Sequence, residues 1–188
     1  MISSNHMTHS GTALLDPHQV FKKIALKEGM RIADLGCGRT GHFVFPASRV
    51  VKDTGVVYAV EIVKNIVESI KSRVRSEGYN NVQVIWGDIE RQGELPIPAE
   101  SLDVCFLVNV LFLVRNKTAV LEEAKRLLQS GGYAVVVEWA HTLGALGPRP
   151  EQFVDSGALK GEAEKMGFTP VDIFPINDYH YCLILKKS

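Results

Sequence analysis

The sequence predicts an α/β protein with a doubly wound, mostly parallel sheet. Apolar runs of strand length alternate along most of the chain with segments whose apolar residues recur at helical spacing. A glycine-rich bend, "GCGRTG" at 36–41, directly follows the first apolar run. The last two apolar runs are separated by only the four residues "PIND". Parallel neighbours need a crossover of about a dozen or more residues, so these two strands are expected to form an antiparallel hairpin.

Length and hydropathy favour one soluble domain. The chain has 188 residues, which is the size of a single domain, and no apolar run approaches the roughly 20 residues that span a membrane. It begins "MISSNHM", with no apolar signal core behind these residues. Residues 1–6 are interpreted as a remnant of cloning, which leaves 7–188 as the expected domain.

Charge and cysteine content restrict the partners and the compartment. The 21 basic and 21 acidic residues cancel, so the chain lacks the overall positive field that helps nucleic-acid binders, and such a partner is disfavoured. The cysteines, Cys37, Cys105 and Cys182, form no CxxC pair. This spacing argues against a disulfide framework or a metal site and favours a reducing, cytoplasmic compartment.

A leading helix is expected at about 16–28. Asp16 is the predicted N-cap, Pro17 occupies the first helical position, and Gln19 completes a capping-box pattern. Gly29 is the predicted C-cap. The residues expected on the buried face are Val20, Phe21 and Ile24.

The remaining elements continue the alternation. Strands are expected at 30–35, 54–61, 82–86, 102–108, 133–139, near 170–174 and at 179–187, and helices at 43–51, 62–78, 117–128 and 156–166. The helix at 62–78 has a stripe of inward-facing residues that are Val63, Ile66, Val67, Ile70 and Val74. A glycine- and proline-rich segment, 140–150, follows the fifth strand and is long enough to be a functional rim.

The glycine bend has two interpretations. Gly36, Gly38 and Gly41 satisfy the spacing GxGxxG, which by itself is weak evidence for a dinucleotide site. Asp34, two positions before the first glycine, discriminates between ligands. An aspartate is unfavourable beside a pyrophosphate and attractive beside a ligand that carries an ammonium and a sulfonium group. Asp34 therefore favours S-adenosylmethionine over NAD, whereas Glu61, at the end of the second strand, suits the ribose of either.

The chain resembles the class I S-adenosylmethionine-dependent methyltransferases. Five ordered segments carry this resemblance: "ADLGCGRTGHF", "VVYAVEI", "VQVIWGDIE", "LPIPAESLDVCFLVNVLF" and "EEAKRLLQSGGYAVVVEW". The resemblance covers roughly 14–187 and is strongest to the small-molecule type related to quinone-biosynthesis methyltransferases. It implies a three-layer, Rossmann-like, seven-stranded sheet of order 3-2-1-4-5-7-6 with an antiparallel last strand.

The resemblance also implies a set of cofactor-binding residues. They are Asp34, Gly36, Cys37, Gly38, Gly41, Glu61, Ile62, Asp88, Ile89 and Asn109. The backbone from Gly36 to Gly38 would pack against the cofactor, and Asn109 lies where the family contacts the methionine end. The bend is one residue longer than the usual GxGxG of the family, which leaves open whether Gly38 or Gly41 approaches the cofactor.

Individual roles follow from motif position within the family. Asp34 would hold the methionine amino group, and Glu61 would accept the ribose hydroxyls. Ile62 would lie against the adenine, Asp88 would accept from its amino group, and Ile89 would offer a backbone amide to the ring.

The expected reaction is an in-line displacement that moves the methyl group to an acceptor and leaves S-adenosylhomocysteine. A base is needed only if the acceptor must lose a proton. His42, Glu138 and His141 are candidates, although each is more simply explained as a satisfied polar residue at the end of an element. Trp139 is a further candidate for the acceptor pocket, and residues 179–181, "YHY", are expected to pack in the hairpin.

The acceptor is expected to be a small molecule. No Asn/Asp-Pro-Pro-Tyr/Phe motif follows the fourth strand, which disfavours methylation of nucleobase amino groups. The leading helix, 110–116 and the 140–155 loop are expected to form the acceptor site, which a partner protein or a second copy would be able to complete. Two alternatives stay open: a non-catalytic subunit or sensor that binds S-adenosylmethionine, and, with less support, an NAD-dependent oxidoreductase.

Overall fold

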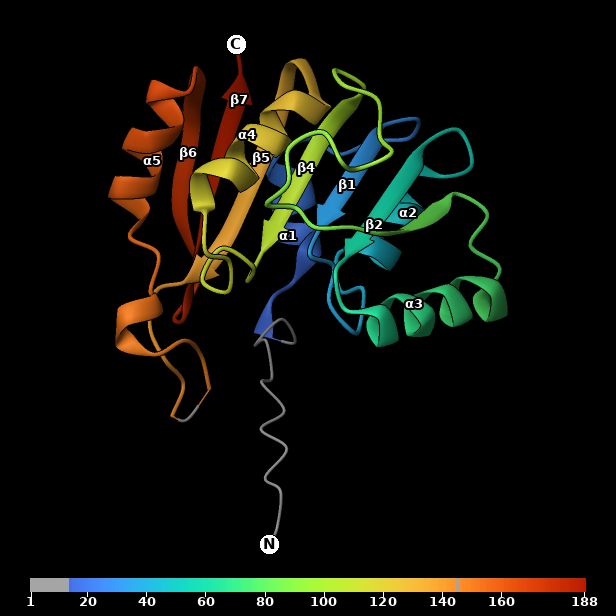
Figure 1. Ribbon diagram of the computed structural model, residues 1–188, viewed down its shortest axis with the longest axis horizontal. Coiled ribbons are helices and arrows are strands. Elements are labelled where there is room, and N and C mark those ends of the chain that lie inside the picture. The colour runs from blue at the N-terminus through green and yellow to red at the C-terminus, as the bar shows by residue number, and fades with distance from the viewer. Residues whose placement is uncertain (1–13, 145) are drawn as a thin grey trace, which may run out of the picture.

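The computed structural model describes residues 14–144 and 146–188, so the remnant of cloning proposed for 1–6 lies outside the described residues. A seven-stranded sheet of order β3-β2-β1-β4-β5-β7-β6 forms the centre of the molecule (Figure 1). Strands β1 to β5 pair in parallel, and β7 runs antiparallel to both β5 and β6. The strands are β1 (Arg31–Leu35), β2 (Val56–Glu61), β3 (Val82–Trp86), β4 (Leu102–Val108), β5 (Leu128–Trp139), β6 (Phe168–Asn177) and β7 (His180–Lys187). The predicted strand order and the closing hairpin are confirmed.

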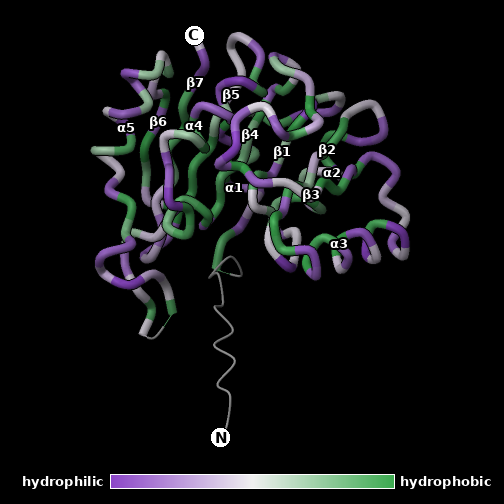
Figure 2. Tube along the Cα trace, viewed as in Figure 1, coloured by the Kyte–Doolittle hydropathy of each residue, from purple (hydrophilic) through white to green (hydrophobic). Residues whose placement is uncertain are grey.

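Helices cover both faces of this sheet and make the expected three layers. They are α1 (Pro17–Lys23), α2 (Val44–Val51), α3 (Lys64–Glu77), α4 (Lys117–Leu127) and α5 (Ser156–Lys165), with a short 3-10 helix, η2 (Pro150–Gln152), before α5. Apolar residues of α1, α2 and α3 form one core with one sheet face, and those of α4 and α5 form a second core with the other face. Strands β2 and β4 are mainly hydrophobic along their length, whereas α3 alternates between hydrophobic and hydrophilic residues (Figure 2).

The leading helix is shorter than predicted. Asp16 accepts the expected capping hydrogen bond from the amide of His18, but α1 ends at Lys23 with Ile24 as its C-cap, and Gly29 is not the cap. The amide of Leu26 donates to the carbonyl of Phe21, and that of Ala25, at φ 50°, donates to Lys22. These two bonds form a Schellman motif, which usually places glycine at the position that Ala25 occupies here. The sequence signal was therefore misleading.

Other boundaries also differ from the prediction, among them the start of β5, which begins at Leu128 and not at 133. Val63, expected on the buried stripe, is the N-cap of α3 and is exposed, because the helix begins at Lys64, two residues later than the predicted start at 62. Strand β6 is longer than expected and runs to Asn177, so only Asp178 and Tyr179 separate it from β7. This longer pairing strengthens the antiparallel edge of the sheet.

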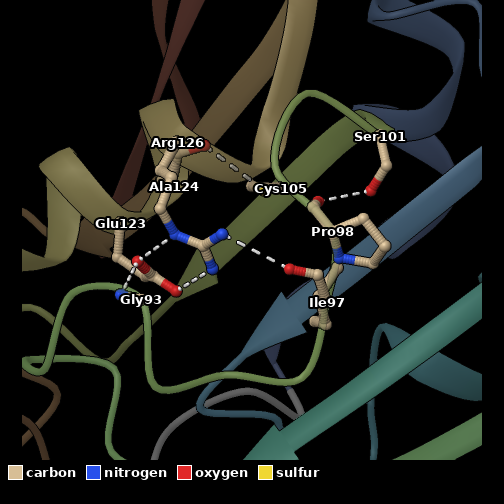
Figure 3. Close-up of polar contacts among 8 residues, drawn as sticks. All are labelled: Gly93, Ile97, Pro98, Ser101, Cys105, Glu123, Ala124 and Arg126. Atoms are coloured by element: carbon tan, nitrogen blue, oxygen red, sulfur yellow. Dashed lines mark hydrogen bonds and ion pairs between the residues drawn. The ribbon is translucent and has the colours of Figure 1, made fainter.

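A polar cluster anchors the connection between β3 and β4 to α4 (Figure 3). The buried carboxylate of Glu123 accepts hydrogen bonds from the amide of Gly93 at 2.8 Å and from the guanidinium of Arg126 at 2.6 and 2.8 Å. Arg126 also donates to the carbonyl of Ile97 at 3.4 Å. A buried carboxylate needs such partners to offset its loss of hydration. The cluster thus fixes the segment that leads away from the predicted site residues Asp88 and Ile89.

Among the residues that the structure describes, no helix is both long and apolar enough to cross a membrane.

Candidate functional site

The glycine bend and Glu61 meet at the carboxyl ends of β1 and β2. The amides of Gly36 and Cys37 donate to the carbonyl of Val60 at 2.9 and 3.0 Å, which continues the pairing of the two strands into the bend. The amide of Gly38 then donates to Oε2 of Glu61 at 3.1 Å. In open α/β sheets ligands bind at this edge, outside the carboxyl ends of the strands.

Glu61 is held by backbone amides. Its Oε1 accepts hydrogen bonds from the amides of Ile62 at 2.9 Å and Val63 at 3.0 Å, and its side chain is buried. No basic residue forms an ion pair with Glu61 among the ion pairs of the described residues. The carboxylate is therefore oriented at the strand end without being neutralised.

Asp34 is the more constrained of the two acids. It is only 3% exposed, and within the described chain its Oδ1 has no hydrogen-bond partner. Burial, and after it the negative charge of Glu61, raises the pKa of Asp34 to about 7. Burial also raises the pKa of the Cys37 thiol, and Asp34 and Glu61 raise it further. Two acids that repel each other form an environment that would be stabilised by a cationic ligand.

The three glycines of the bend have different surroundings. A Cβ added to Gly36 would lie 2.5 Å from Cγ2 of Val110, so this glycine permits close packing against the chain after β4. A Cβ added to Gly41 would lie 2.6 Å from the ring of Phe45, so Gly41 is also packed against protein. A Cβ added to Gly38 would meet no atom of the described residues within 4 Å. Of the last two glycines, Gly38 is the one that faces open space.

The glycine bend forms one wall of the candidate site, and residues that follow β2 and β3 form a second wall. Ile62 is 53% exposed and Trp86 is 57% exposed, and the indole nitrogen of Trp86 donates to the carbonyl of Ile62 at 2.8 Å. Asp88, which follows β3, accepts from the amide of Glu90 at 2.9 Å, and the neighbouring Ile89 is buried. Exposed apolar side chains beside a carboxylate suit a flat, polar-edged ring such as adenine.

Asn109 directly follows β4 and is buried at φ 50°. Its backbone amide donates to the carbonyl of Val137 at 2.8 Å, and its side-chain Nδ2 lies 3.2 Å from Nε2 of His180. His180 is buried, and its ring lies 4.3 Å from that of Trp139. The packing expected for 179–181 is present at His180, but its contact with Asn109 could not be foreseen, because β7 is distant in sequence.

The three candidate bases differ in their surroundings. Nε2 of His42 lies 2.6 Å from the carbonyl of Leu15, and His141 is exposed after β5. Glu138 has no exposed surface, and burial raises its pKa to about 8 although backbone hydrogen bonds, that of Leu111 first, oppose this rise. Trp139 is 1% exposed and lies beneath Gly147, so its indole is covered by the loop after β5.

A groove of about 580 Å³ lies near the ends of β5 and the β6–β7 hairpin. Its walls include His141 and Ser156 on one side and Ile173, Phe174 and Asn177 of β6 on the other. The described residues that line it include no lysine or arginine. Of the segments predicted to form the acceptor site, the 140–155 loop contributes His141 to the groove, whereas no described residue of the leading helix or of 110–116 lines it. The β6–β7 hairpin lines the groove although the sequence did not predict this.

The sheet order, the antiparallel β7 and the acidic glycine bend together define the Rossmann-like architecture of class I methyltransferases. A family model described as "Methyltransferase domain" matches residues 26–169, and the chain belongs to this family. The resemblance to class I S-adenosylmethionine-dependent methyltransferases is thereby confirmed.

Two relatives of similar sequence are also named as methyltransferases. The chain is 28% identical over 145 residues to a demethylmenaquinone methyltransferase of Lactococcus lactis, an alignment that covers 74% of this chain and 56% of the relative. It is 30% identical over 129 residues to the ubiquinone/menaquinone biosynthesis C-methyltransferase UbiE of Vibrio parahaemolyticus, covering 65% of this chain and 48% of the relative. The chain thus spans about half the length of these curated relatives.

Solved structures show the same fold. A SAM-dependent methyltransferase from Aquifex aeolicus is similar with a TM-score of 0.85 and 25% identity, covering 96% of this chain and 94% of that one. The [4+2]-cyclase SpnF is similar with a TM-score of 0.76 and 17% identity, covering 94% and 80%. The second likeness concerns the fold alone, and it illustrates that function must be argued from the site.

Proposed function

We propose that the protein is an S-adenosylmethionine-dependent methyltransferase that transfers a methyl group by in-line displacement to a small-molecule acceptor and releases S-adenosylhomocysteine. The observation that carries this proposal is the pair of buried acids, Asp34 and Glu61, around the glycine bend. Neither forms an ion pair with a described residue. The ammonium and sulfonium groups of the donor would supply the missing positive charge, whereas the pyrophosphate of NAD would add negative charge.

The residues of this edge suit the parts of the donor. Asp34 would accept from the methionine amino group, with Asn109 nearby, and Glu61 would accept from the ribose hydroxyls. Gly38 leaves room for the ligand, and the backbone of Gly36 and Cys37 forms the floor of the bend. In this proposal Gly41 supports the bend from behind by packing on Phe45.

The adenine would lie along the second wall. Ile62 presents an exposed apolar surface for the ring. Asp88, whose Oδ2 lies 3.5 Å from Nε of Arg91, would accept from the exocyclic amino group. The backbone of Ile89 follows directly, where its amide would reach a ring nitrogen. These contacts bind and orient the donor, which is the main contribution that a protein makes to transfer from an activated sulfonium.

The groove at the β6–β7 hairpin is the proposed acceptor site. Its volume of about 580 Å³ lies in the range of small-molecule pockets, and Ile173, Phe174 and Pro175 give it an apolar wall. Among the described residues its lining holds no lysine or arginine and includes the acidic Asp178, which disfavours carboxylate or phosphate groups on the acceptor. Relatives named for demethylmenaquinone and for ubiquinone or menaquinone biosynthesis support an acceptor that is a small molecule.

If the acceptor must lose a proton, one of the candidates His42, Glu138 and His141 would act as the base. His141, which lines the groove, is placed to meet an acceptor proton, and the other two are engaged with the backbone. A single domain over 7–188 and a cytoplasmic location remain part of the proposal. Completion of the site by a partner protein or a second copy also remains a proposal.

Two measurements test the proposal. Calorimetry should show binding of S-adenosylhomocysteine and none of NADH, and the reverse result would overturn the proposal in favour of an oxidoreductase. Incubation with methyl-labelled donor and a fractionated small-molecule extract should then label a non-protein acceptor. Binding of S-adenosylhomocysteine without transfer to any fraction would contradict catalysis and select the non-catalytic alternative.

A further inference from the structure

Two polar side chains, one from β5 and one from β7, hold the turn that follows β4. In the sheet these two strands lie on the side of β4 that faces away from β1. Glu138 is the last residue but one of β5 and His180 begins β7, and the two strands pair so that Trp139 lies opposite His180. Both side chains are completely buried. Their polar contacts reach Asn109, Val110 and Leu111, the first three residues after β4.

Glu138 binds the turn through its carboxylate. Its Oε1 accepts hydrogen bonds from the amides of Val110 at 2.9 Å and Leu111 at 2.6 Å. Its Oε2 is buried and has no hydrogen-bond partner within the described residues. Burial of a carboxylate is costly, so a residue that served only to fill space would be better replaced by an apolar one. The two amides explain why an acceptor is needed at this position.

His180 orients Asn109 through a defined chain of hydrogen bonds. Its Nδ1 lies 3.2 Å from Oδ1 of Asn177, which accepts and cannot donate, so we assign the proton to Nδ1. Nε2 is then an acceptor and receives the hydrogen bond from Nδ2 of Asn109 at 3.2 Å. Both ring nitrogens of a neutral imidazole are therefore used, and the orientation of the Asn109 amide follows from the tautomer.

The turn at 109–111 also contacts the glycine bend. Val110 packs so closely on Gly36 that a Cβ on the glycine would lie 2.5 Å from Cγ2 of Val110. A shift of the turn would therefore move Asn109, which is part of it, and would also displace the glycine bend. Contact thus runs from β5 and β7, through the turn, to the two segments that border the proposed donor site.

We propose that Glu138 and His180 are positioning residues that set the turn at 109–111 and, through it, the glycine bend and Asn109 for binding of the methyl donor. The inference rests on the proposed function, since it assigns a role in the same site. It gives Glu138 a role through the backbone of the turn and not as a base that touches the acceptor. It also gives the closing hairpin a part in the donor site.

The experiment compares apolar and conservative variants by calorimetry with S-adenosylhomocysteine. Glu138→Leu and His180→Phe remove the acceptor atoms, and we expect each to weaken binding by about tenfold or more. Glu138→Gln and His180→Gln retain a side-chain oxygen that can accept, and they should stay within about threefold of the wild type. Val136→Ala, a buried change two residues earlier on β5, is the matched control for lost stability and should leave the affinity unchanged.

Amide hydrogen exchange gives a second readout that needs no ligand. In Glu138→Leu the amides of Val110 and Leu111 should exchange faster than in the wild type, whereas amides in the centre of β4 should change no more than in Val136→Ala. Wild-type affinity in folded Glu138→Leu and His180→Phe would overturn the inference, as would an equal loss in the glutamine variants. Failure of the wild type to bind the ligand would instead contradict the proposed function.

Discussion

Oε2 of Glu61 accepts a 3.1 Å hydrogen bond from the backbone amide of Gly38, so the end of β2 holds the glycine bend that follows β1. Oε1 of the same carboxylate accepts from the amides of Ile62 and Val63. Glu61 therefore shapes the pocket before any ligand arrives. Both acceptor sites of Oε1 are used by these amides, whereas Oε2 accepts only from Gly38 and keeps a site for a ribose hydroxyl. The first prediction tests both roles together.

Glu61→Ala should weaken binding of S-adenosylhomocysteine by about tenfold or more. The variant loses charged hydrogen bonds that each contribute about 1.5 to 3 kcal/mol, and it releases the amide of Gly38. Calorimetry measures the dissociation constant. Glu68→Ala, on the exposed surface of α3, is the control and should bind as the wild type does. An unchanged constant in Glu61→Ala would remove this residue from the site.

Asp34→Asn should separate stability from binding. The variant removes a buried carboxylate that is unfavourable when ionised, so at pH 8 the ligand-free protein should gain about 1 kcal/mol or more in its free energy of unfolding. The same change removes the negative charge proposed to face the ammonium group, so donor affinity should fall by about tenfold or more. Urea unfolding and calorimetry check the two effects, and a variant that binds normally would exclude Asp34 from donor recognition.

The stability gain of Asp34→Asn should depend on pH. The pKa of Asp34 rises from 3.8 to about 7 in the folded state, so between these values the folded protein binds more protons than the unfolded one. Ionisation of Asp34 therefore removes stability as pH rises from about 4 to 7.

The difference between variant and wild type isolates this effect. It should be small near pH 4, grow with pH and level off above about 7, as measured by urea unfolding across the range. His180, whose pKa burial lowers to about 4, has the opposite slope between about 4 and 6.5 but is present in both proteins. A difference that does not vary with pH would contradict the raised pKa of Asp34.

Alanine at the last two glycines of the bend should have different effects. Both have positive φ, so each change strains the backbone by about 1 to 2 kcal/mol. Gly41→Ala also places a methyl group against Phe45 and should cost more stability, whereas Gly38→Ala places it in open space and should chiefly weaken donor binding. Thermal unfolding and calorimetry distinguish them, and a larger binding defect in a folded Gly41→Ala would reverse the assignment.

Local patterns predicted the elements of the fold well, because alternation of apolar runs and helical stripes reports burial directly. Strands β3 and β4 begin and end where expected, and the short link before β7 correctly indicated an antiparallel pair. The end of α1 was wrong, because a Schellman motif with Ala25 in the left-handed region replaced the expected glycine cap. Cap geometry depends on where the following residue, Leu26, packs, and this is decided by the core.

Sequence motifs alone indicated the family and the acidic residues beside the glycine bend, because these follow from residue types at short, regular spacings. The strand order was implied by the resemblance to that family. Three-dimensional packing was needed to show which glycine has open space beside it, how Glu61 holds the bend, and that His180 and Glu138 reach the turn after β4. The physical reason is that these contacts join strands that are far apart in the chain and adjacent in the sheet. Their distances depend on sheet register and burial, which no local pattern encodes.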